Sequence, residues 1–325
     1  MSETTLEEVT SKLMNKWVMT EQVNKTWNGM AISHNRQEGV LTISMKRDIE
    51  AMLIQFGMAE CKPEKTPAAP STKLAKPTST DAVDPEAAKF PYREAVGALL
   101  WFGRTGRPDI LYSVNQVTKF CFMWDHSHVT AVKRIMRYLK ATLDLKLTFR
   151  KSKDPHLVIY ADSDFASEPE ANDKPICSTS GMVAYSHGIG AIFAAVNLEK
   201  TISLSTAEAE YKAITRACKF AAGVIQFYEE IGFPFQDPTP IFNDNQAAIA
   251  MAKQQFCTSA TRHMKIKYHF IREQVKEGIV SLSYCPTGSM VADIMTKALD
   301  RILFERFRDM LLDGKDMDVV HGECV

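Results

Sequence analysis

Hydrophobic and polar positions divide the second half of the chain into short stretches with strand periodicity and longer stretches with helix periodicity. The expected strands are 157–161, 181–185, 191–196, 201–204 (a short strand or a strand end), 240–243 and 279–284. The expected helices are 206–230, which Gly232 and Pro234 close, 245–253, 266–275 and one that begins near Ser289. This order of elements predicts an α/β fold with a mixed sheet covered by helices.

The first half of the chain is less regular. Residues 39–45 alternate as a strand does, and the spacing over 49–56 predicts a helix that Gly57 ends. Prolines crowd residues 62–91, which predicts a linker or a long surface loop. Residues 92–150 have a helical pattern, and the helix at 128–140 is the clearest, with its apolar face formed by Val132, Ile135, Met136 and Leu139.

The opposite face of that helix is basic, because it carries Lys133, Arg134, Arg137 and Lys140. Such a face is most often only solvated. The functional alternative is a stripe of cations that follows a phosphate backbone.

Composition narrows the class of protein. The 325 residues contain 39 Lys+Arg and 39 Asp+Glu, so the net charge is zero and a histone-like polycation is excluded, although local positive charge is not. No apolar run approaches the roughly 18 residues of a membrane span. The start of the chain is polar, so no secretory signal is expected. The seven cysteines are scattered without a C-x-x-C pair, which predicts reduced cysteines and an intracellular protein.

Two acids mark the end of the first strand of the predicted sheet. Asp162 follows its most apolar run, where the sites of such sheets collect, although a turn residue would stand there as well. Asp164 lies two residues on, so its side chain shares the same face. Asp164 therefore stays a possible second contributor.

The long helix opens with two glutamates of different character. Glu208 fits a capping box with Ser205 and precedes Lys212 by four residues, so a cap and a surface ion pair explain it. Glu210 instead leads the inward stripe Ile214, Ala217 and Ala221. A carboxylate on that stripe is costly unless a cation or another partner compensates it, so Glu210 is the better functional candidate.

Two further acids complete the pattern. Asp244 follows the strand 240–243, and Asp293 lies in the expected first turn of the last helix. Taken alone, each is better explained as a helix cap or a dipole partner. Together, however, four acids near one sheet edge suit Mg²⁺ or Mn²⁺, and two such ions can promote in-line phosphodiester hydrolysis. No glycine-rich phosphate loop is present, so no small-molecule cofactor is expected.

Taken in order, the motifs of the chain resemble the carboxyl-terminal part of the Pol polyprotein of copia-type LTR retrotransposons. Stretches within 13–67 resemble the end of its reverse transcriptase, and stretches within 92–140 resemble its connection. The motifs that resemble its ribonuclease H (RNase H) domain are YADSD (160–164), STSG (178–181), SLSTAEAEYKAI (203–214), NDNQAAIA (243–250), RHMKIKYHFIRE (262–273) and VADIMTKAL (291–299).

The resemblance implies an RNase H-like mixed five-stranded sheet with flanking helices. It implies five segments: a remnant of the reverse-transcriptase palm and thumb (1–61), the Pro-rich linker (62–91), a helical connection (92–153), the RNase H-like domain (154–300), and a carboxyl-terminal helix and tail (301–325). The paired aspartates of the polymerase (Y-x-D-D) are missing from the sequence. A complete DNA polymerase centre is therefore not expected.

The resemblance also implies chemistry. Asp162, Glu210, Asp244 and Asp293 would form a DEDD quartet that holds two Mg²⁺ or Mn²⁺ ions, with Asp162 between the ions and Asp293 on the water side. The substrate would be an RNA–DNA hybrid, whose RNA strand is cut. The protein would act in the cytoplasm, in virus-like particles, or in the nucleus.

Three possibilities remain open. The chain is either an active nuclease or a catalytically inactive remnant kept as a nucleic-acid-binding subunit. A structural subunit that completes a reverse transcriptase supplied in trans is a third possibility.

Overall fold

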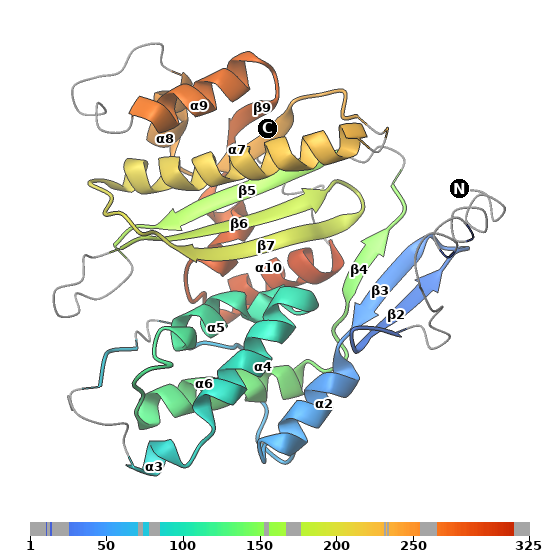
Figure 1. Cartoon of the computed structure of the whole chain (residues 1–325), viewed down its shortest axis with the longest axis vertical. Coiled ribbons are helices and arrows are strands. Elements are labelled where there is room, and N and C mark those ends of the chain that lie inside the picture. The colour runs from blue at the N-terminus through green and yellow to red at the C-terminus, as the bar shows by residue number, and fades with distance from the viewer. Residues whose placement is uncertain are drawn as a thin grey trace.

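The computed structural model describes residues 11, 14, 26–70, 74–77, 85–152, 156–166, 177–230, 232, 234–253 and 265–314. Most of the first 25 residues and the tail beyond 314 lie outside the described residues. Two sheets and the helices around them make up the described chain (Figure 1). Among the described residues, no helix is both long and apolar enough to cross a membrane.

The larger sheet has five strands in the order β7-β6-β5-β8-β9. They are β5 (Leu157–Asp164), β6 (Thr179–Ser186), β7 (Gly190–Leu198), β8 (Thr239–Asn243) and β9 (Val280–Tyr284). β6 runs antiparallel to β5 and β7, whereas β8 is parallel to both β5 and β9. The predicted mixed five-stranded sheet is therefore confirmed. All of β6, and β5 as far as residue 163, is buried, as expected for strands covered on both faces.

Helices cover both faces of this sheet (Figure 1). Because side chains alternate along a strand, Leu157 and Ile159 of β5 pack toward one face and Val158 and Tyr160 toward the other. The first face contacts three helices: α7 (Thr206–Glu230), α8 (Gln246–Lys253) and α9 (Lys265–Lys276). The second face packs on α10 (Arg301–Asp313) and on the core of the helical unit.

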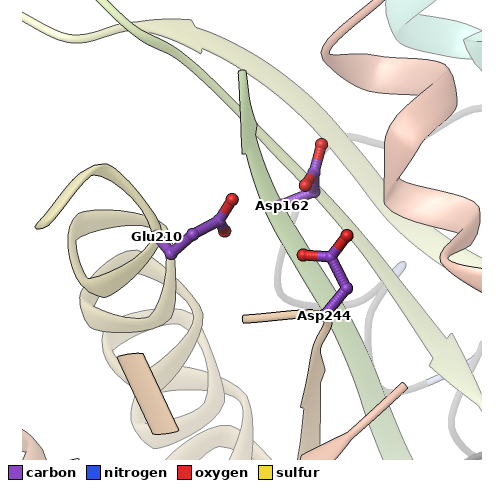
Figure 2. A group of neighbouring side chains, drawn as sticks. All are labelled: Asp162, Glu210 and Asp244. Atoms are coloured by element: carbon purple, nitrogen blue, oxygen red, sulfur yellow. The ribbon is translucent and has the colours of Figure 1, made fainter. Parts of the chain in front are cut away.

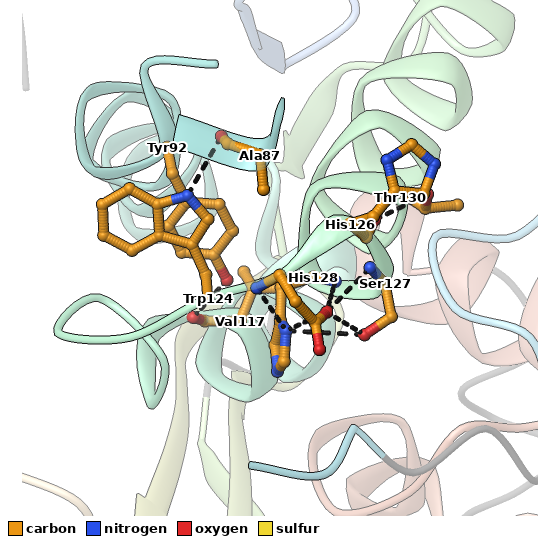
Figure 3. Close-up of polar contacts among 9 residues, drawn as sticks. Ala87, Tyr92, Val117, Trp124, His126, Ser127, His128 and Thr130 are labelled. Carbon is orange, nitrogen blue, oxygen red and sulfur yellow. Dashed lines mark hydrogen bonds and ion pairs between the residues drawn. The ribbon is translucent and has the colours of Figure 1, made fainter. Parts of the chain in front are cut away.

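The helical unit consists of α3 (Pro85–Ala88), α4 (Tyr92–Thr105), η1 (Pro108–Ile110), α5 (Leu111–Thr118) and α6 (His126–Ala141). Asp125 caps α6, since its carboxylate accepts hydrogen bonds from the amides of Ser127 and His128. Tyr92 donates to Val117 O at 2.8 Å (Figure 3). The four apolar positions predicted for the helix now labelled α6 are fully buried, which confirms its predicted apolar face.

A smaller sheet joins segments that are far apart in the sequence. Its strands are β1 (Thr26–Trp27), β2 (Met30–Asn35), β3 (Val40–Ser44) and β4 (Leu147–Arg150), and α2 (Lys46–Gln55) follows β3. β4 pairs antiparallel with β3, so the prediction that 92–150 is helical is wrong at its end. The backbone of 147–150 forms this ladder because β3 offers a free edge. β1 and β2 were not expected.

Three other expectations need correction. Residues 201–204 form no strand, because the Lys212 ammonium donates hydrogen bonds to the carbonyls of Thr201 and Ile202. The helix expected near Ser289 is instead two 3₁₀ segments, η3 (Thr287–Ser289) and η4 (Val291–Met295), before α10 begins. Four described cysteines are free (61, 121, 177 and 218), but Cys285 is disulfide-bonded, contrary to the expectation of reduced cysteines.

Candidate active site

Three carboxylates converge at one end of the larger sheet (Figure 2). Asp162 of β5, Glu210 of α7 and Asp244 after β8 each place an oxygen within 4.8 Å of the other two. Asp162 and Glu210 are 3% and 5% exposed, and Asp244 is half-buried. β5 and β8 are parallel neighbours, so acids near their carboxyl ends meet at the same edge.

The two glutamates at the start of α7 have different roles, as the helix pattern predicts. Glu210 lies with Ile214 on the buried stripe. Glu208 accepts a hydrogen bond from the backbone amide of Leu204 at 2.8 Å, whereas the capping box predicted the amide of Ser205 as its donor. Glu208 also forms an ion pair with Lys212 at 3.2 Å. This pair is buried rather than on the surface, since its side chains are 7% and 4% exposed. Glu208 is therefore fully engaged in structure.

Asp244 is not the cap of α8. Asn245 has that role, because its Oδ1 accepts the amide of Ala248 at 2.9 Å. Asp244 Oδ2 instead accepts a hydrogen bond from Thr287 at 2.9 Å. Asn245 thus performs the capping role that the sequence also allowed for Asp244. The Asp244 carboxylate instead lies with those of Asp162 and Glu210 (Figure 2).

Asp293 lies in η4 and is 1% exposed. It is outside the group of three, but the nearby charge of Asp162 acts on it. Its Oδ2 is 2.9 Å from the ammonium of Lys297, and its Oδ1 has no hydrogen-bond partner among the described residues. Asp164 is half-buried and does not belong to the group of three.

Four residues that the sequence analysis did not single out hold these acids in place. Asn243 Nδ2 donates to Glu210 Oε2 at 2.9 Å and to Ala161 O at 2.8 Å. Thr296 donates from its hydroxyl to Asp162 Oδ2. Thr287 and Lys297 contact Asp244 and Asp293, as described above. The available signal was position: Asn243, Thr296 and Lys297 each stand in the same short motif as an acid.

Burial and mutual repulsion shape the charge of the site. Burial, and next the charge of Asp162, raises the pKa of Glu210 to about 9, although the Asn243 hydrogen bond lowers it. The same two causes raise the pKa of Asp293 to about 8. Burial also raises the pKa of Asp244. The cluster therefore has less positive charge than its acids require, although Lys297 supplies one cation.

A divalent cation would correct this deficit. Carboxylate oxygens are the ligands that Mg²⁺ and Mn²⁺ prefer, and Asp293 Oδ1 is a buried acceptor without a hydrogen-bond partner among the described residues. Asp162, Glu210, Asp244 and Asp293 thus fit such ions by donor chemistry and by charge.

The basic face of α6 has structural partners. Arg137 pairs with Glu64 at 2.9 Å, and Arg134 donates to Thr66 at 3.0 Å. Lys140 donates to the carbonyl of Ala59. Lys133 lies 5.3 Å from the centre of the Phe90 ring. These contacts fasten residues 59–66 to α6, so the proposed contact of this face with nucleic acid stays a prediction that the geometry does not favour.

No protein-family model matches the sequence. The chain is 34% identical over 285 residues to the retrovirus-related Pol polyprotein from transposon TNT 1-94 of Nicotiana tabacum, which covers 87% of this chain and 21% of that protein. It is 32% identical over 278 residues to the corresponding polyprotein from transposon RE1 of Arabidopsis thaliana, covering 86% and 18%. The chain thus spans about a fifth of the length of these curated relatives.

Among solved structures, LC11-RNase H1 in complex with RNA/DNA hybrid aligns with 46% of this chain and 99% of its own, at 16% identity and a TM-score of 0.33. The larger sheet and its acidic edge define a mixed α/β protein with a group of carboxylates at one end of its five-stranded sheet. The chain is related to the Pol polyproteins of copia-type transposons, which confirms the resemblance seen in its motifs.

Proposed function

We propose that the chain is a metal-dependent RNase H that hydrolyses the RNA strand of an RNA–DNA hybrid and leaves 3′-hydroxyl and 5′-phosphate ends. The observation that carries this proposal is the convergence of Asp162, Glu210 and Asp244 within 4.8 Å. The choice of substrate rests on the relation to retrotransposon Pol polyproteins. Association with a reverse transcriptase in trans, and an intracellular site of action, stay predictions.

The side chains of the site have separable tasks. Asp162, Glu210 and Asp244 would hold one divalent ion, and Asp162 with Asp293 would hold the second. The bound ions would supply the positive charge that activates water and stabilises the leaving oxygen. Asn243 fixes the Glu210 carboxylate and Thr296 fixes that of Asp162, so the oxygens need little rearrangement on binding.

Recognition of RNA would come from groups near Glu210. Glu210 stands near the start of α7, and a 2′-hydroxyl is the group by which proteins distinguish RNA from DNA. A 2′-hydroxyl bound beside Glu210 would direct cleavage to the RNA strand rather than the DNA strand.

The test is cleavage of a labelled RNA–DNA hybrid with Mg²⁺ or Mn²⁺, with an all-DNA duplex as the control substrate. We expect cleavage of the RNA strand alone and loss of cleavage in Asp162→Asn, which keeps the size of the side chain. Asp237→Asn is the matched control, because Asp237 is exposed and does not belong to the group of acids. Cleavage by Asp162→Asn at the wild-type rate would disprove the assignment.

A thermal shift with divalent ions separates an active enzyme from an inactive remnant. A ligand that binds only the folded state raises its stability, so Mn²⁺ should raise the melting temperature of the wild type and not that of Asp162→Asn. A wild type that binds hybrid but shows neither stabilisation nor cleavage would be a nucleic-acid-binding remnant.

A further inference from the structure

Lys297 places a positive charge inside the cluster of acids. Its ammonium lies 2.9 Å from Asp293 Oδ2, and Asp293 is 1% exposed while the Lys297 side chain is 38% exposed. Within the described part of the chain, Asp293 is the only ion-pair partner of Lys297. The lysine thus touches a buried acid from the solvent side.

The charge of Lys297 extends to more than one acid. The carboxylates of Asp162, Asp293 and Asp244 all raise the pKa of Lys297, against the effect of its burial. In return, Lys297 lowers the pKa of Asp244 and of Asp293. The ammonium therefore compensates part of the same negative charge that a divalent ion would neutralise.

Lys212, in contrast to Lys297, is a buried lysine whose ion pair is fixed in place. Lys212 is 4% exposed and, besides its pair with Glu208, donates to the backbone of residues 201 and 202 and to Ser203. Lys297 lacks such additional anchors among the described residues and is half exposed. Its flexible four-carbon stem can move the ammonium into solvent.

We propose that Lys297 is an internal counter-ion, which occupies Asp293 Oδ2 in the metal-free protein and competes with the divalent cation for that carboxylate. This inference rests on the proposed function, because it presupposes that the acids bind metal. Lys297 leaves Asp293 when the ion binds. It therefore stabilises the metal-free fold and weakens metal affinity, which is the opposite of what a residue that only positions Asp293 would do.

The test is calorimetric titration of the metal-free protein with Mn²⁺. Lys297→Met keeps the length of the side chain and removes its charge. We expect Lys297→Met to bind Mn²⁺ about tenfold more tightly than the wild type, because a cation within a few ångströms no longer repels the ion. In the same variant the melting temperature without metal should fall. Lys297→Arg should stay near the wild type in both measurements.

Two controls make the result specific. Lys219→Met removes an exposed lysine of α7 and should leave Mn²⁺ affinity unchanged. In an Asp293→Asn background the contested carboxylate is gone, so Lys297→Met should change the affinity much less than in the wild type. This double-variant comparison isolates the coupling between the two residues. If Lys297→Met does not fold, Lys297→Gln replaces it in the same series.

The outcomes are distinct. Unchanged or weaker Mn²⁺ binding by folded Lys297→Met, with normal binding by the wild type, overturns the counter-ion proposal alone. Absence of Mn²⁺ binding by the wild type overturns the proposed function together with it. Tighter binding that disappears in the Asp293→Asn background supports the proposal.

Discussion

Gly181 lies directly opposite Asp162 in the antiparallel pairing of β6 with β5. A Cβ at position 181 would lie 2.7 Å from Met295 Cβ and 2.7 Å from Thr296 Cγ2. Atoms do not pack this closely, so the absence of a side chain at 181 lets η4 rest on the sheet. That contact brings the Thr296 hydroxyl to Asp162 and places Asp293 beside it.

Substituting Gly181→Ala should therefore damage the metal site more than the fold. The added methyl group pushes η4 away from β6, and with it Asp293 and Thr296. We expect the gain in melting temperature on adding Mn²⁺ to be largely lost and cleavage of hybrid to fall by about 10- to 100-fold, as for residues that orient metal ligands. Thermal shift with and without Mn²⁺ measures the first effect, and the hybrid assay measures the second.

Gly223→Ala is the matched control. Gly223 lies in α7 and a Cβ there would meet nothing within 4 Å, so this change should stabilise the protein by about 0.5–1 kcal/mol and leave metal binding intact. Adding Thr296→Ser to Gly181→Ala removes the methyl group that clashes and keeps the hydroxyl, so it should restore part of the Mn²⁺ response. A normal Mn²⁺ response in Gly181→Ala would contradict the argument.

Stability without metal should depend on pH through Glu210. In the folded protein burial and Asp162 raise the pKa of Glu210 to about 9. The unfolded chain loses the same proton near the ordinary value of about 4.3. Between these values the folded state binds more protons, so the free energy of unfolding falls as pH rises. Asp293, with its pKa raised to about 8, acts in the same direction.

We expect the melting temperature in chelator to drop between about pH 6 and pH 9, and to drop less in Glu210→Gln. Glu277→Gln, at an exposed position, is the control and should follow the wild type. Fluorescence-monitored melting across this range is sufficient. A profile that Glu210→Gln leaves unchanged would show that Glu210 does not hold its proton in the folded state.

Breaking the buried pair of Lys212 and Glu208 should be costly. Lys212→Met leaves Glu208 buried without its cation, and loss of one partner of a buried pair costs about 3–5 kcal/mol. A surface pair, as the sequence alone indicated, would cost at most about 1 kcal/mol. Urea unfolding measures the difference. The double variant Lys212→Met/Glu208→Gln should recover much of the lost stability, because no buried charge is then left unpaired. A loss below about 1 kcal/mol in Lys212→Met alone would show that the pair behaves as a surface ion pair.

The basic face of α6 should contribute to stability rather than to binding of hybrid. Arg137 donates to Lys62 O at 2.6 Å, and Lys140 donates to Ala59 O. Replacing both cations by Gln should lower the free energy of unfolding by about 1–3 kcal/mol. The slope of log affinity against log salt for hybrid should stay the same. A slope that flattens by about 1–2 would instead show that these side chains contact phosphate.

Much of the larger sheet follows from local pattern. The apolar runs predicted β5, β6, β7, β8 and β9, and the helical spacing predicted α7 to within a residue, because the periods of strands and helices are properties of consecutive residues. The same reasoning separated Glu210 from Glu208, since a stripe and a capping pattern are both local. Two of the regions where the prediction failed, 147–150 and 201–204, take their conformation from partners elsewhere in the chain.

The sequence by itself determined which acids stand at the ends of strands and on the inward face of α7. Only the tertiary structure decided how they are used. Asn245 rather than Asp244 caps α8, Lys297 enters the acid cluster, and Gly181 admits η4 to the sheet. The physical reason is that a carboxylate near a strand end has several local uses of similar energy. Contacts made only after distant segments pack together select one of them.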